Sequence, residues 1–117
     1  MNKLKKEQLK KLRRKHRTVI KGDSGRPRLS VYRSLKHIYA QVIDDQLGRT
    51  IVYANDSEVK DVKGKKKSEI AFEVGKILAE KAKKQDISKV IFDKGMFLYH
   101  GRVKAVAEGA RDGGLEF

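Results

Sequence analysis

The sequence predicts an α/β protein, a two-layer sandwich in which helices cover one face of a mixed sheet, preceded by a basic N-terminal arm. Three short segments rich in Val, Ile and Tyr follow one another at 28–33, 37–44 and 50–55, which favours antiparallel strands. A helical period then covers 69–84, and a short apolar run separates it from a second helical stretch at 101–111. A chain of 117 residues has room for one core of this kind.

The positive charge is concentrated at the N-terminus. Residues 1–21 carry ten Lys or Arg and one acid, Glu7, whereas the whole chain has a net charge of +14. We expect a helix at 3–17 that becomes ordered on RNA, because its apolar stripe is too thin to enter a core. The sequence therefore predicts a basic RNA-binding arm and linker at 1–25 and a globular domain at 26–117. A solvated tail without function is the alternative.

The first two strands each alternate between an apolar and a polar face. The apolar positions are Leu29, Val31, Ile38, Ala40 and Val42. The polar positions are Arg28, Ser30, Tyr32, His37, Tyr39 and Gln41. The third strand is less clearly two-sided, so its register stays open. With helices on the apolar face, the polar face remains uncovered and can stack on bases, donate hydrogen bonds and neutralise phosphate, unless it is an ordinary solvated face.

The second half of the chain predicts the covering helices. A lysine-rich stretch at 57–67 reads as a loop, and Ser68 is the expected N-cap of the helix at 69–84. The apolar run at 90–92 predicts a buried strand joined through a right-handed crossover. The last helix, at 101–111, buries Val and Ala at helical spacing and is closed by two glycines.

Composition excludes several kinds of site. The chain has no cysteine, so it has neither disulfides nor thiolate metal ligands. Its three histidines, His16, His37 and His100, lack the spacing of a zinc site and are expected to contact RNA or solvent. No continuous apolar run indicates export or a membrane span. We therefore expect no metal, no cofactor and no membrane partner.

Three carboxylates raise the alternative of a nuclease. Asp44 and Asp93 lie at predicted strand ends, where acidic side chains can hold magnesium ions. Asp45 follows directly, but successive strand residues point to opposite faces. The segment 44–48 is therefore interpreted as a hairpin turn. The chain also lacks a glycine-rich phosphate loop, so nucleotide hydrolysis is not indicated.

The connection into the last helix combines apolar, aromatic and basic residues. In order, it contains Phe97, Leu98, Tyr99, His100, Gly101 and Arg102. The glycine and arginine lie where the helix begins, so backbone N–H groups and the helix dipole could receive a phosphate while the tyrosine or histidine stacks. The alternative is an ordinary helix start with the phenylalanine and leucine in the core.

The order of these segments resembles a known family, bacterial large-subunit ribosomal protein eighteen. The matching segments are Arg28-Leu29-Ser30-Val31-Tyr32-Arg33-Ser34, His37-Ile38-Tyr39-Ala40-Gln41-Val42, Phe92-Asp93, residues 98–104 and Gly113-Gly114-Leu115-Glu116-Phe117. The resemblance covers essentially the whole chain. Small departures are Leu35, where Asn is frequent, and Met96, where Gly is common.

The resemblance implies a structural protein without catalytic activity that binds 5S rRNA and helps attach it to 23S rRNA at the central protuberance of the large subunit. It also implies a monomer within a cytoplasmic ribosome, beside neighbouring large-subunit proteins. The predicted RNA-binding residues are Lys10, Lys11, Arg13, Arg14, Lys15, His16, Arg17, Arg26, Arg28, Ser30, Tyr32, Arg33, Ser34, Lys36, His37, Tyr39, Gln41, Tyr99, His100, Gly101 and Arg102. The rivals are a magnesium-dependent ribonuclease and an architectural binder of duplex DNA.

Overall fold

The computed structural model describes residues 25–60, 62–95 and 97–117, so the predicted arm lies outside the described residues except for Gly25. The elements are β1 (Arg28–Arg33), β2 (Ile38–Asp44), β3 (Arg49–Asn55), the short 3-10 helix η1 (Asp56–Glu58), α2 (Lys67–Lys84), β4 (Ile91–Asp93) and α3 (Arg102–Asp112). Within these ranges no helix is both long and apolar enough to cross a membrane.

The four strands form one mixed sheet in the order β3-β2-β1-β4. The pairs β1–β2 and β2–β3 are antiparallel, and β1–β4 is parallel, which confirms the predicted mixed sheet. Leu29 pairs with Val42, so apolar residues of neighbouring strands share a face. The β2–β3 ladder shifts register between Val42 and Ile43. This irregularity explains why the sequence of β3 did not show a clean two-sided pattern.

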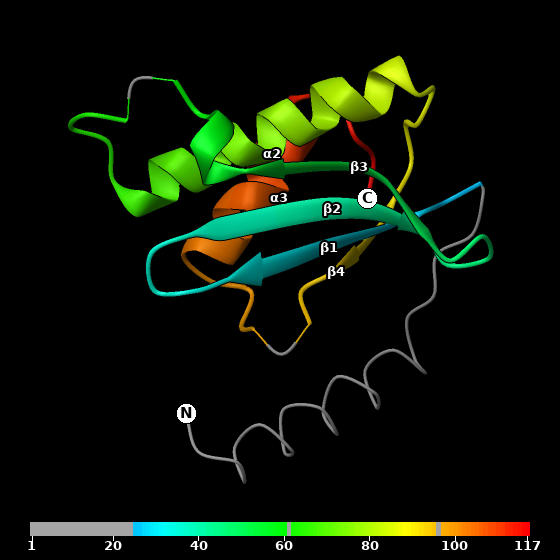
Figure 1. The fold of residues 1–117 in the computed structure, drawn as a ribbon, viewed down its shortest axis with the longest axis horizontal. Coiled ribbons are helices and arrows are strands. Elements are labelled where there is room, and N and C mark those ends of the chain that lie inside the picture. The colour runs from blue at the N-terminus through cyan, green and yellow to red at the C-terminus, as the bar shows by residue number, and fades with distance from the viewer. Residues whose placement is uncertain (1–24, 61, 96) are drawn as a thin grey trace, which may run out of the picture.

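Both helices pack on the same face of the sheet (Figure 1), as the periodicity predicted. The apolar residues of β1 and β2 meet those of α2 and α3 in one core. Its largest fully buried side chains are Leu29, Val42, Val74, Leu78, Val90, Val103, Val106 and Pro27. Among the residues that the structure describes, no helix covers the opposite face of the sheet, which matches the predicted two-layer sandwich.

The two helices approach each other through glycines. A Cβ atom on Gly75 of α2 would lie 2.2 Å from the carbonyl oxygen of Val106. One on Gly109 of α3 would lie 2.0 Å from the carbonyl oxygen of Phe72. Because both contacts are with backbone atoms, no side-chain movement can relieve them. The helices therefore pack backbone to backbone at these positions.

The element ends differ slightly from the prediction. Helix α2 begins at Lys67 with Lys66 as its N-cap, so the expectation that Ser68 caps it is wrong. The helix starts earlier because the Lys66 carbonyl already accepts a hydrogen bond from the N–H of Ile70, at 3.1 Å. Strand β4 starts one residue later than predicted. Gly101 is the N-cap of α3 and has a positive φ of 58°, which favours glycine.

Candidate nucleic-acid interface

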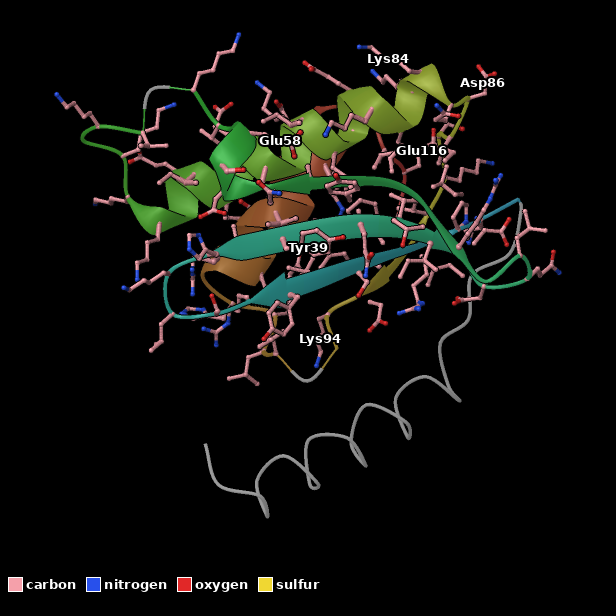
Figure 2. The ribbon with its side chains drawn as sticks, viewed as in Figure 1. Tyr39, Glu58, Lys84, Asp86, Lys94 and Glu116 are labelled. Carbon is pink, nitrogen blue, oxygen red and sulfur yellow. The ribbon has the colours of Figure 1, made fainter. Side chains whose placement is uncertain are left out.

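The uncovered face of the sheet carries a row of aromatic side chains. Tyr32 of β1 and Tyr39 of β2 are direct cross-strand partners. The ring centroids of Tyr39 and Tyr53 are 5.8 Å apart, and Phe97 packs edge-on against Tyr32 at 6.1 Å. Figure 2 shows Tyr39 on the viewer's side of β2, with the helices behind the sheet. The predicted polar face is thus the uncovered one, and Tyr53 extends it onto β3.

Gln41 adds hydrogen-bonding capacity to this face. Its side-chain oxygen accepts from the hydroxyl of Thr50 at 3.0 Å and from the hydroxyl of Tyr39 at 3.3 Å. These two bonds orient the amide so that its NH₂ group remains a donor beside the tyrosines. The face therefore combines flat aromatic surface with polar groups, as recognition of unstacked bases requires.

The hairpin between β1 and β2 is exposed but firmly held. Arg102 Nη2 donates to the Ser34 carbonyl oxygen at 2.6 Å, and Lys67 Nζ donates to the Leu35 carbonyl oxygen at 2.8 Å. The N–H of Ser34 also donates to the carbonyl of His37 at 2.8 Å. The first residues of both helices thus brace the hairpin. The cationic side chains of Lys67 and Arg102 therefore lie next to the hairpin. Arg102 is turned toward the hairpin and does not point only outward.

Arg28 corrects the sequence prediction, which placed it on the exposed face. Only 6 % of the residue is exposed, and its Nη1 lies 2.8 Å from Asp93 Oδ2. Nε and Nη2 donate to the two oxygens of Asp45, each at 3.1 Å. Burial would lower the pKa of Arg28, but the bonds to Asp45 and then Asp93 raise the pKa above its ordinary value. The Arg28 guanidinium therefore pairs with carboxylates of the protein itself and links β1 to β4 and to the β2–β3 turn.

The carboxylates of the nuclease alternative are also structural. Asp44 is 3 % exposed, and its Oδ1 accepts from the backbone N–H groups of Gln46 and Leu47, as the turn interpretation predicted. Asp93 accepts from Arg28 and from the N–H of Gly95. Among the residues that the structure describes, no group of three or more His, Asp or Glu could hold a metal ion.

The segment before α3 separates into two parts. Arg102 joins the hairpin, whereas Tyr99 packs edge-on against Phe92 at 5.7 Å and accepts a hydrogen bond from Arg111 at 3.2 Å. Leu98 is 78 % exposed, so the alternative that placed it in the core is wrong. His100 is exposed as well. Tyr99 and His100 are therefore accessible, but Tyr99 is tied to the C-terminal side of the domain.

The predicted RNA-binding residues consequently fall into three groups. Those of the arm, which are Lys10, Lys11, Arg13, Arg14, Lys15, His16 and Arg17, lie outside the described residues. The exposed or partly exposed ones are Arg26, Ser30, Tyr32, Arg33, Ser34, Lys36, His37, Tyr39, Gln41, Tyr99, His100, Gly101 and Arg102. The guanidinium of Arg33 lies 5.1 Å from the ring centroid of Phe97, so it extends the aromatic row. Of the predicted residues that the structure describes, only Arg28 is buried.

Sequence reasoning missed Tyr53 and Lys67. The alternation of β3 could have indicated Tyr53, but the register shift obscured it. Lys67 is one of several lysines in the stretch before α2, and its contact with Leu35 spans 32 residues. No local pattern distinguishes it from its neighbours.

Comparisons with known proteins identify the family. A family model described as ribosomal L18 of archaea, bacteria, mitochondria and chloroplast matches residues 3–117. The chain is 61% identical over 94 residues to large ribosomal subunit protein uL18 of Thermus thermophilus, covering 80% of this chain and 82% of the relative. It is 54% identical over 110 residues to that of Chloroherpeton thalassium, covering 92% and 91%. It is 58% identical over 104 residues to that of Desulfatibacillum aliphaticivorans, covering 86% and 85%. The chain therefore belongs to the ribosomal L18 family, a protein of the large ribosomal subunit and not an enzyme.

Proposed function

We propose that this large-subunit protein binds 5S rRNA and helps attach it to 23S rRNA at the central protuberance, as a monomer beside neighbouring ribosomal proteins. The observation that carries the proposal is the uncovered sheet face. Its aromatic row, from Tyr53 to Phe97, runs into a braced hairpin that carries Lys36 and is flanked by Lys67 and Arg102. This combination suits folded RNA, whose unpaired bases stack on aromatic rings while cations neutralise the backbone.

The proposal divides the work between two parts of the chain. The arm and linker at 1–25 supply positive charge and grip the phosphate backbone, without reading sequence. The domain at 26–117 reads the shape of the RNA through its sheet face, its hairpin and the residues Tyr99 to Arg102. Affinity thus comes largely from the arm, and specificity from the domain.

A competition measurement tests the specificity. The full chain is titrated with 5S rRNA at physiological salt, against an unrelated structured RNA and a DNA duplex of equal length. We expect tighter binding to 5S rRNA than to either competitor. Equal affinity for the unrelated RNA would refute specific recognition, and equal affinity for the duplex would favour an architectural DNA binder.

Salt dependence tests the role of the arm. If the arm neutralises about six to eight phosphates, the logarithm of affinity falls with the logarithm of salt concentration by about 0.7 to 0.9 per contact. Deleting residues 1–17 should flatten this dependence while the preference for 5S rRNA persists. Tyr39→Ala should do the reverse, lowering the preference with little change in slope. An unchanged slope after the deletion would show that the arm does not bind the backbone.

A further inference from the structure

A groove of about 340 Å³ opens on the uncovered face, where the hairpin meets η1. It is lined by Tyr32, Ser34, His37, Ile38, Tyr39, Asn55, Asp56 and Ser57. Its volume lies near the lower limit of small-ligand sites, so it offers room for one nucleotide rather than a larger ligand. Four of its lining residues, which are Ile38, Asn55, Asp56 and Ser57, were not among the predicted RNA-binding residues.

The walls of the groove suit a flat ring. Tyr32 and Tyr39 stand side by side as cross-strand partners, and Tyr32 is 49 % exposed. Exposed aromatic rings stack on bases that are not paired in a helix. Bases in a duplex are unavailable for such contacts, so the occupant is an unpaired one.

One of the side chains that line the groove is a carboxylate, that of Asp56. Asp56 Oδ2 lies 2.8 Å from Nδ1 of His37, which fixes the side chain. Over the described part of the chain, the other oxygen, Oδ1, has no hydrogen-bond partner. A capping box centred on Asn55 and Glu58 sets the backbone of η1 and therefore the position of Asp56.

An acidic side chain on a surface that faces RNA repels phosphate, unless it meets a hydrogen-bond donor of a base. An ionised carboxylate can only accept hydrogen bonds. Guanine presents two adjacent donors on its Watson–Crick edge, N1–H and the N2 amino group. Adenine, cytosine and uracil each present one donor beside acceptor atoms, which the carboxylate would repel.

We propose that this groove receives one unpaired base of the bound RNA and that Asp56 selects guanine. Tyr32 and Tyr39 supply the stacking surface, and His37 holds the carboxylate in place. This inference rests on the proposed RNA-binding function and adds to it the class of nucleotide and a residue that discriminates between bases.

The test uses Asp56→Asn in the full chain. The asparagine has the same shape but presents one acceptor and one donor group, so it no longer matches two adjacent donors. Affinities are measured for 5S rRNA and for transcripts in which each unpaired guanine is replaced in turn by adenine. We expect one of these replacements to lower the affinity of the unaltered protein by about fivefold or more. The same replacement should leave Asp56→Asn nearly unaffected.

For each protein, the readout is the ratio of its affinity for 5S rRNA to its affinity for the transcript with the replaced guanine. A ratio is needed because removing a negative charge raises the affinity for any RNA. Asp112→Asn is the matched control, since Asp112 is an exposed carboxylate at the end of α3 and should keep the guanine preference. If every replacement affects Asp56→Asn and the unaltered chain equally, the inference is wrong while the proposed function stands. If 5S rRNA is not preferred over unrelated RNA, the proposed function itself fails.

Discussion

The substitution Asp93→Asn should strongly destabilise the fold, although it removes no atom from the core. Asp93 and Arg28 have side-chain exposures of 3 % and 7 %, and their charged atoms are 2.8 Å apart. Removing one partner of a buried ion pair costs about 3–5 kcal/mol, because the other charge stays buried. Asn retains an acceptor for the N–H of Gly95, and Asp45 still pairs with Arg28, so we expect the lower end, about 3 kcal/mol.

Thermal unfolding followed by circular dichroism measures this loss. For a domain of this size, about 3 kcal/mol lowers the melting temperature by on the order of 12–24 °C. Asp112→Asn makes the same chemical change in an exposed pair, where Lys76 and Asp112 are 3.6 Å apart and 42 % and 58 % exposed. Exposed pairs contribute about 1 kcal/mol or less, so this variant should melt close to the unaltered protein. Melting temperatures that fall equally in the two variants would refute the reasoning.

Three further predictions concern packing, pH and the hairpin. Gly109→Ala should lower thermal stability by about 1–3 kcal/mol, because the clash with the facing helix outweighs a helix-propensity gain of about 1 kcal/mol. Any gain in stability would contradict this prediction. Burial alone would raise the pKa of Glu58, but hydrogen bonds from Lys81 and a backbone N–H lower it overall. Its stabilising contribution is therefore complete above the pKa of unfolded Glu and is lost as pH falls through the lower folded pKa. When the free energy of unfolding by urea is plotted against pH, Glu58→Gln should lose less stability on the acid side than the unaltered protein. The same loss on the acid side in both proteins would contradict this prediction. Lys67→Met should shift and broaden the amide signals of the hairpin in NMR spectra, whereas the exposed control Lys63→Met should not. If the hairpin signals are the same in the two variants, Lys67 does not stabilise the hairpin.

Local pattern was enough to predict most of the fold. Strand alternation placed β1 and β2 within a residue of their bounds, because each has one buried face. Helical periodicity likewise placed α2 and α3 within two residues at either end. The N-cap of α2 failed because a serine in a favourable sequence position competed with lysines that extend the helix just as well.

The candidate site was predicted less completely, because its geometry depends on contacts between distant residues. The bonds of Arg28 to Asp45 and Asp93 span 17 and 65 residues, and the bond of Arg102 to Ser34 spans 68. Alternation assigned Arg28 correctly to the polar side of β1. It could not show that two carboxylates from elsewhere would cover that side chain.

Under the proposed function, the braced hairpin determines how the protein presents its cations to RNA. A free loop would lose conformational entropy on binding, and that loss would reduce the affinity. Here Lys67 and Arg102 already hold two successive carbonyl groups of the hairpin, so Lys36 and His37 project from a backbone fixed in the unbound protein. The same two cations add positive potential beside the hairpin. The domain therefore presents a hairpin with a fixed backbone beside the cations of Lys67 and Arg102. For this reason we assign selectivity to the domain, although most of the net charge belongs to the arm.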